Sequence, residues 1–298
     1  MNIKSVLKLI EIKTLTAGFL PVLLGSVYSC YSFNRINLLY TATLAIAIAL
    51  IQSATNMFND YMDYQRGADG EDKADEKVLV SGELRSHQIL KLVIGFFFIA
   101  LIIGVAIASQ TSWAILLVAL AGAVVAFVYS FGAIPISYTP FGEVVSGVTM
   151  GIGITATVVF IQSGHFYIQS IFMAVPTAIS IAYIMFTNNL CDLEKDKRAG
   201  RRTLPGLLGF NTAKIMWMLG CVLLILMTII LIICGIFPVW DAIVVLLIVN
   251  YRSMHDIWRF EEEQFQKNRM MGTIGKIGVQ YHLLIMIGLV IADVAKLQ

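Results

Sequence analysis

Long apolar runs, separated by short polar segments, dominate the pattern of this chain. A bilayer core of roughly 30 Å needs about 20 apolar residues per helix, and backbone groups in lipid must be paired within helices or closed barrels. Because the runs are too long and continuous for barrel strands, the pattern predicts helices. Nine spans are expected, at residues 14–33, 37–58, 88–108, 111–130, 141–162, 168–188, 212–234, 237–252 and 276–295.

The composition supports this interpretation. Of 298 residues, 58% are hydrophobic and 13% are charged, whereas about a quarter of a soluble domain is charged. We therefore expect an all-α integral membrane protein, a bundle of about nine transmembrane helices in one domain over residues 1–298, with lipid around it and no nucleic-acid partner. The segment from Met1 to Lys13 lacks a cleavable signal pattern and predicts a short interfacial helix. The four cysteines show no metal or redox spacing, so no disulfide is expected.

The positions of the basic residues predict the orientation. With a cytoplasmic N-terminus, 19 of the 21 Lys and Arg residues lie on the inner side of the nine spans, and only Arg35 and Lys296 lie outside. This asymmetry is the one that membrane proteins show. We expect a multi-pass protein of the cell membrane, whose polar stretches after the second and sixth spans both face the cytoplasm. The spans then form two four-helix pseudo-repeats and a ninth helix.

Those two polar stretches carry the candidate chemistry. On a helix, residues four or seven apart share a face, so each stretch presents an amide and two carboxylates in one direction. Oxygen clusters of this kind suit Mg²⁺, and carboxylates at helix C-terminal ends are unfavourable unless a cation compensates them. The alternative is a pair of polar caps where helices leave the membrane. The candidate metal ligands, with the carboxylates also as catalytic residues, are Asn56, Asp60, Asp63, Asn188, Asp192 and Asp196.

Basic loops containing glycine follow both stretches. Arg and Lys beside a Mg²⁺ site are what a diphosphate requires, since the metal bridges some phosphate oxygens and the basic groups take the remaining charge. Membrane topology alone also explains basic residues on the inner side. The candidate diphosphate-binding side chains are Arg66, Lys73, Lys77, Lys197, Arg201 and Arg202.

The paired motifs, together with nine spans, resemble the UbiA superfamily of intramembrane prenyltransferases. The motifs are Asn56-x-x-x-Asp60-x-x-Asp63 and Asn188-x-x-x-Asp192-x-x-x-Asp196. Further details, among them Asn59-Asp60-Tyr61, Asn188-Asn189 and the connection from Tyr129 to Tyr138, are similar to the menaquinone branch, the 1,4-dihydroxy-2-naphthoate polyprenyltransferases. One departure is Cys191, which stands where this branch usually has Arg; a neighbouring Lys or Arg could substitute.

The resemblance implies a function. Two Mg²⁺ ions held by the motifs would bind a polyprenyl diphosphate, with Asn56, Asn59, Asn188 and Asn189 among the diphosphate-binding residues. The allylic carbon would then be attacked by the ring of an aromatic acid, whose carboxylate is lost and replaced by the prenyl chain. Water must be excluded because it would quench the cation-like carbon.

The acceptor residues are sought in the uncharged connection between the fourth and fifth spans. Tyr129 and Tyr138 could shield a cationic carbon with their rings, and Glu143 is a rare acid at a span boundary. An interfacial aromatic belt, with Glu143 favouring a helix N-terminus, is the alternative. The segment Arg252 to Gly272 reads either as an amphipathic helix covering the site or as a plain linker.

Other functions remain open at this point. A prenyltransferase of the same kind could use another aromatic acceptor, such as 4-hydroxybenzoate. A CDP-alcohol phosphotransferase would need Ala-Arg after Asp69-Gly70, which this chain lacks. A divalent-cation transporter is a different class, but it should carry its acids at the middle of the membrane.

Overall fold

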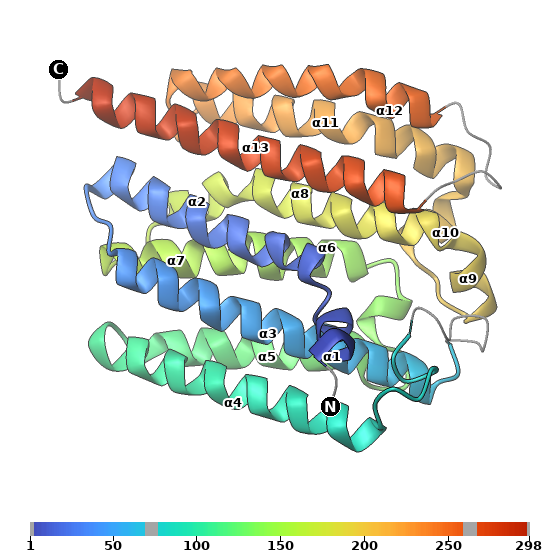
Figure 1. Ribbon diagram of the computed structural model, residues 1–298. Helices are drawn as coiled ribbons and strands as arrows, with labels where there is room; N and C mark the ends of the chain where they lie inside the picture. Colours follow the sequence, from blue (N-terminus) through green and yellow to red (C-terminus); the bar gives the residue numbers. More distant parts are fainter. Residues whose placement is uncertain (1–2, 69–76, 259–266, 297–298) are drawn as a thin grey trace. The chain divides into compact units, whose positions relative to one another are not determined.

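The computed structural model describes residues 3–68, 77–258 and 267–296, and these parts contain helices and no strand (Figure 1). Lys73 and Asp69 lie outside the described residues, as does the middle of the segment Arg252 to Gly272. The helices are α1 Ile3–Ile10, η1 Ile12–Leu15, α2 Thr16–Phe33, α3 Leu38–Gln65, α4 Ser86–Gln110, α5 Ala114–Ser130, η3 Ile136–Tyr138, α6 Gly142–Ser146, η4 Gly147–Gly153, α7 Ile154–Ser163, α8 Ile168–Cys191, α9 Leu193–Arg198, α10 Leu204–Leu208, α11 Phe210–Ile233, η5 Val239–Asn250, α12 Tyr251–Trp258 and α13 Lys267–Lys296.

Seven helical segments of the described chain are long and apolar enough to cross a membrane. They are Thr16–Phe33, Leu38–Gln65, Ser86–Gln110, Gly142–Ser163, Ile168–Cys191, Phe210–Ile233 and Lys267–Lys296. The other two expected spans are also helical but shorter, since α5 has 17 residues and η5 has 12 before it continues into α12. Their outward surfaces are apolar, with Leu117 71% and Ile248 64% exposed, as lipid contact requires. The protein is therefore a multi-pass helical membrane protein, although the count of nine spans is not confirmed.

The helices form two compact units, residues 1–19 with 38–135, and residues 20–37 with 136–298. This division differs from two four-helix groups, because most of α2 packs with the second unit. The physical reason is a close approach at Gly25, where an added Cβ would come within 3.0 Å of the Thr155 carbonyl oxygen on α7.

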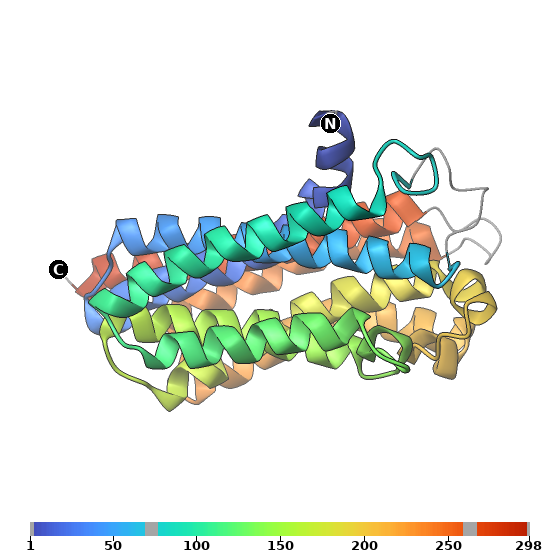
Figure 2. The ribbon, with the colours of Figure 1, turned by 90° about the horizontal axis from the view of Figure 1, so that it is seen from below.

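In the first unit, α3 and α4 lie side by side (Figure 1), and α1 stands across their direction (Figure 2). Buried side chains from these helices and from the connection after α3 form its core, including Leu9, Met57, Leu79 and Ile89. The Glu83 carboxylate accepts hydrogen bonds from Ser5 and, at 3.5 Å, from Lys8. The short helix expected before the first span is therefore present as α1, and it is held to the polar connection between α3 and α4.

In the second unit, α8 is the central helix and packs against η4, α11 and α13. Small residues permit these contacts. A Cβ on Gly151 would lie 2.4 Å from the Ala178 Cα, and a Cβ on Gly220 would lie 2.3 Å from the Tyr183 ring. Around Gly151 the helix widens into a π-helical segment, η4. Such π-helical turns are frequent at functional sites.

Candidate functional site

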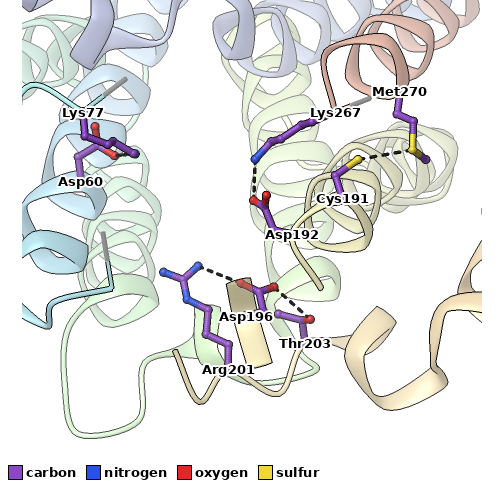
Figure 3. Close-up of polar contacts among 9 residues, drawn as sticks. All are labelled: Asp60, Lys77, Cys191, Asp192, Asp196, Arg201, Thr203, Lys267 and Met270. Carbon is purple, nitrogen blue, oxygen red and sulfur yellow. Dashed lines mark hydrogen bonds and ion pairs between the residues drawn. The ribbon is translucent and has the colours of Figure 1, made fainter. Parts of the chain in front are cut away.

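The first acidic stretch lies on the last three turns of α3, which continues to Gln65, seven residues beyond the expected end of that span. A continuous helix therefore carries Asn56, Asp60 and Asp63 on one face, as predicted. Asp60 forms an ion pair with Lys77 from the connection after the helix (Figure 3), with the two side chains 12% and 23% exposed. Asp63 is buried. This stretch thus brings two carboxylates, an amide and a lysine into one place.

The amides of this stretch are fixed by neighbouring segments. The Asn56 Nδ2 group donates to the Ile10 carbonyl at 3.0 Å and to Thr14 Oγ1 at 2.8 Å. These bonds use the amide nitrogen, so Oδ1 is the atom that a cation would take. Asn59 Oδ1 already accepts a hydrogen bond from Ser130 Oγ at 3.0 Å, which makes Asn59 a structural link between α3 and α5.

The second acidic stretch differs from the continuous helical stripe that its spacing predicts. The helix α8 ends at Cys191, and Asp192 (φ −104°, ψ 16°) separates it from the short helix α9. The backbone still forms hydrogen bonds between residues four apart across this break. The Asp192 N–H donates to the Asn188 carbonyl at 3.1 Å, and the Asp196 N–H donates to the Asp192 carbonyl at 2.8 Å. The break points the two carboxylates at different partners.

Asp192 is paired with a lysine from the start of α13. The Lys267 Nζ atom lies 2.6 Å from Asp192 Oδ2 (Figure 3). Sequence reasoning did not select Lys267, which is 75 positions away and belongs to no motif, although it lies in the segment Arg252 to Gly272 that one interpretation places over the site. The neighbouring Cys191 Sγ lies 3.5 Å from Met270 Sδ, one turn further along α13.

Asp196 is buried and held by groups from the following loop. Arg201 Nη1 lies 3.7 Å from its Oδ1, and Thr203 Oγ1 donates to its Oδ2 at 3.4 Å. Burial raises the pKa of Asp196 to about 6, although Arg201 opposes the rise. The Arg201 guanidinium also lies 4.6 Å from the centre of the Tyr138 ring.

The candidate acceptor residues are divided between the units. Tyr138 contacts Arg201, and Glu143 Oε1 accepts a hydrogen bond from Asn189 Nδ2 at 2.8 Å, so both touch residues of the second stretch. Glu143 is 2% exposed and lies in the first turn of α6, so it is a buried, partnered acid and also stands at a helix N-terminus, as the alternative interpretation expects. Tyr129 lies on α5 in the first unit.

Three of the predicted basic side chains make other contacts. Arg66 Nη2 donates to the Gly132 carbonyl at 3.2 Å. Lys197 pairs with the exposed Glu194 at 2.6 Å. Arg202 is exposed, and its backbone N–H donates to the Tyr138 carbonyl at 3.0 Å. Two predicted basic residues, Lys77 and Arg201, form ion pairs with candidate metal ligands.

The donor chemistry fits a hard divalent cation. Within the described residues, no three His, Cys, Asp or Glu side chains gather closely enough to hold a metal by themselves. Each stretch supplies two such groups, and its third oxygen comes from an amide. Three of the four carboxylates already attract a cationic side chain, namely Asp60, Asp192 and Asp196. Oxygen donors in a place that demands positive charge are what Mg²⁺ requires.

Known proteins show the same sequence and fold features. The UbiA prenyltransferase family profile matches residues 18–273. The 1,4-dihydroxy-2-naphthoate octaprenyltransferase of Bacillus subtilis (strain 168) is 38% identical over 205 residues, 67% of this chain and 64% of that protein. UbiA prenyltransferase domain-containing protein 1 of Xenopus tropicalis is 27% identical over 197 residues, 65% of this chain and 56% of that protein. The matched region thus spans less than two thirds of either relative.

Solved structures share the fold. A UbiA homolog from Archaeoglobus fulgidus, bound to GPP and Mg²⁺, aligns with a TM-score of 0.68 at 16% identity over 96% of this chain and 99% of that one. The apo structure of a UbiA homolog from Aeropyrum pernix K1 aligns with a TM-score of 0.65 at 16% identity over 95% of this chain and 98% of that one. With the family profile covering most of the chain, the protein belongs to the UbiA prenyltransferase family.

Proposed function

We propose that this protein transfers a polyprenyl chain from polyprenyl diphosphate to 1,4-dihydroxy-2-naphthoate, giving demethylmenaquinol, a step of menaquinone biosynthesis. The observation that carries the proposal is the pairing of the motif carboxylates with basic side chains in both units, in a chain of this family. The similarity to the Bacillus subtilis enzyme supports this acceptor over 4-hydroxybenzoate.

Two Mg²⁺ ions complete the proposed site. Asn56, Asp60 and Asp63 would hold one, and Asn188, Asp192 and Asp196 the other. Bound there, the ions would neutralise the diphosphate and would stabilise the charge that develops as it leaves. The relatives solved with GPP or DMAPP and Mg²⁺ are consistent with this requirement.

The chain's own basic residues act on the diphosphate. Lys77 and Arg201 each pair with a motif carboxylate, so each would be placed to donate to the phosphate oxygens of a bound diphosphate. Arg201 offers a planar pair of donors to those oxygens. Its contact with Tyr138 holds the guanidinium in place, which lowers the cost of orienting it when substrate binds.

The acceptor is proposed to meet Tyr138 and Glu143, with Tyr129 as a further ring near the reacting carbon. The ring carbon that bears the carboxylate bonds to the allylic carbon, and the allylic C–O bond breaks with its electron pair leaving on the diphosphate. Carbon dioxide then departs, and the electron pair of its C–C bond restores the aromatic ring. Water would have to be excluded from the cation-like carbon during this step.

The distribution of basic residues supports a location in the cell membrane with the N-terminus and active site facing the cytoplasm. The diphosphate of the substrate would therefore lie at the inner leaflet, and its prenyl tail would lie in the lipid phase.

Turnover by purified protein tests the proposal. We expect product from polyprenyl diphosphate and 1,4-dihydroxy-2-naphthoate only with Mg²⁺, and loss of product in Asp60→Asn and Asp192→Asn. Glu194→Gln is the matched control, because this exposed carboxylate on α9 belongs to neither motif and pairs with the neighbouring Lys197. Turnover that persists in EDTA or in both Asp variants would reject the mechanism. Faster turnover of 4-hydroxybenzoate would reject the acceptor, and cation flux without a prenyl donor would favour a transporter.

A further inference from the structure

Lys267 occupies a distinctive place beside the second acidic stretch. Its Nζ atom lies 2.6 Å from Asp192 Oδ2, yet its side chain is 47% exposed and that of Asp192 is 20% exposed. Because the Lys267 side chain is this exposed, its ammonium group can move to another partner without leaving a packed core. The pair is therefore an exchangeable contact.

The corresponding carboxylate of the first acidic stretch, Asp60, is also paired with a lysine. Asp60 follows Asn56 by four residues, as Asp192 follows Asn188, and Asp60 is paired with Lys77. Both lysines come from segments outside the stretch that carries the carboxylate. Each stretch thus has one carboxylate with a lysine brought to it from elsewhere in its own unit, and the pair of the second stretch is the more exposed one.

Cys191 strengthens the comparison. A thiol has no charge to offer a phosphate, and here its Sγ atom lies against Met270 on α13, 3.5 Å from Sδ. Position 191 therefore faces the helix that supplies Lys267. Lys267, three positions before Met270, therefore reaches the second acidic stretch beside Cys191.

We propose that Lys267 is a diphosphate-binding residue, the counterpart of Lys77, held on Asp192 until a divalent ion displaces it. This inference rests on the proposed function and adds a residue to its site. A Mg²⁺ ion that binds Asp192 competes with the lysine for the carboxylate. The released ammonium then lies next to the metal, where it can donate to a phosphate oxygen.

This exchange predicts effects of opposite sign. Lys267→Met removes a competitor, so Mn²⁺ alone should bind up to about fivefold more tightly, the range for an ion pair this exposed. The same variant loses a charge-assisted hydrogen bond to the anion, so inorganic pyrophosphate in the presence of Mn²⁺ should bind about tenfold more weakly. If Lys267 only stabilised the fold, its replacement would weaken both Mn²⁺ binding and pyrophosphate binding.

Electron paramagnetic resonance of free Mn²⁺, with and without pyrophosphate, measures both affinities on the full-length protein in detergent. Lys267→Arg keeps the charge and should retain most of the pyrophosphate affinity. Lys276→Met is the control, because this exposed lysine lies on the same helix. We expect it to match the wild type in both measurements.

Equal pyrophosphate affinities of Lys267→Met and Lys276→Met would overturn the inference and leave the proposed function standing. Parallel weakening of Mn²⁺ and pyrophosphate binding in Lys267→Met would also overturn it. A wild-type protein that binds neither probe would overturn the proposed function, and this inference with it.

Discussion

Replacing Arg201 by Met leaves the buried carboxylate of Asp196 without its guanidinium, and the structure bounds the cost. Asp196 is 4% exposed and Arg201 is 12% exposed, and with the guanidinium present the pKa of Asp196 is about 6. Without it the pKa rises further, until the carboxyl group protonates and the cost stops growing. At about pH 7.5 this limit is about 1.5 pKa units, or about 2 kcal/mol of unfolding free energy.

The Tyr138 contact adds to this cost. Loss of a guanidinium lying 4.6 Å from the ring centre removes about 0.5–1 kcal/mol. We therefore expect Arg201→Met to lower the unfolding free energy by about 2–3 kcal/mol at about pH 7.5. Because the folded pKa of Asp196 is raised, the carboxyl group stabilises the fold while protonated and loses that contribution as the pH rises through about 6. The difference from wild type should shrink to about 1 kcal/mol at about pH 6.

Reversible unfolding in detergent micelles with EDTA measures these values without metal. A double-mutant cycle with Asp196→Asn isolates the pair, and we expect a coupling energy of about 2 kcal/mol. The reasoning is refuted if Arg201→Met costs the same in the wild-type and Asp196→Asn backgrounds, or if its cost does not change between about pH 7.5 and pH 6.

Three further predictions follow from single contacts. Thr14→Val removes an acceptor of the Asn56 amide, which should cost about 1 kcal/mol and weaken Mn²⁺ binding several-fold. Glu143→Ala leaves the buried Asn189 amide without its acceptor and should destabilise the protein by about 2–3 kcal/mol in thermal unfolding, whereas Glu143→Gln keeps a carbonyl oxygen and should cost less than half as much. Gly151→Ala forces a carbon against the α8 backbone, and unfolding should show a loss of about 1–3 kcal/mol.

Each of these predictions has a control. Thr14→Ser keeps the hydroxyl and should bind Mn²⁺ as the wild type does; a loss equal to that of Thr14→Val would contradict the role of the hydrogen bond. Equal losses in Glu143→Gln and Glu143→Ala would show that the acceptor oxygen is unimportant. Gly153→Ala places its carbon 3.7 Å from the nearest atom, a backbone oxygen, so a cost equal to that of Gly151→Ala would contradict the packing argument.

Hydropathy predicted the helix ends well where the helix ends with its apolar run. The expected spans at 14–33 and 88–108 correspond to Thr16–Phe33 and Ser86–Gln110. Hydropathy gave the wrong helix ends where a helix continues past the apolar run, because it detects the length of the apolar run and not backbone hydrogen bonding. For this reason α3 reaches Gln65, and α13 starts at Lys267, nine residues before the expected span.

The candidate site shows a similar limit. Spacing predicted the shared face of Asn56 and Asp60 because both belong to one helix. It did not predict the break at Asp192, nor Lys267, whose pairing depends on how α13 packs against α8. Residue type and local interval identify the carboxylates, whereas their partners are set by tertiary contacts that a single sequence does not display. The roles of the acceptor residues stay a prediction.

The number of Mn²⁺ ions that bind each chain with pyrophosphate present tests the central claim most directly. The account predicts two ions in the wild-type protein and the loss of one in either Asp60→Asn or Asp192→Asn, since each stretch is proposed to hold its own ion. One ion or none in the wild type, or two ions retained in both variants, would contradict it.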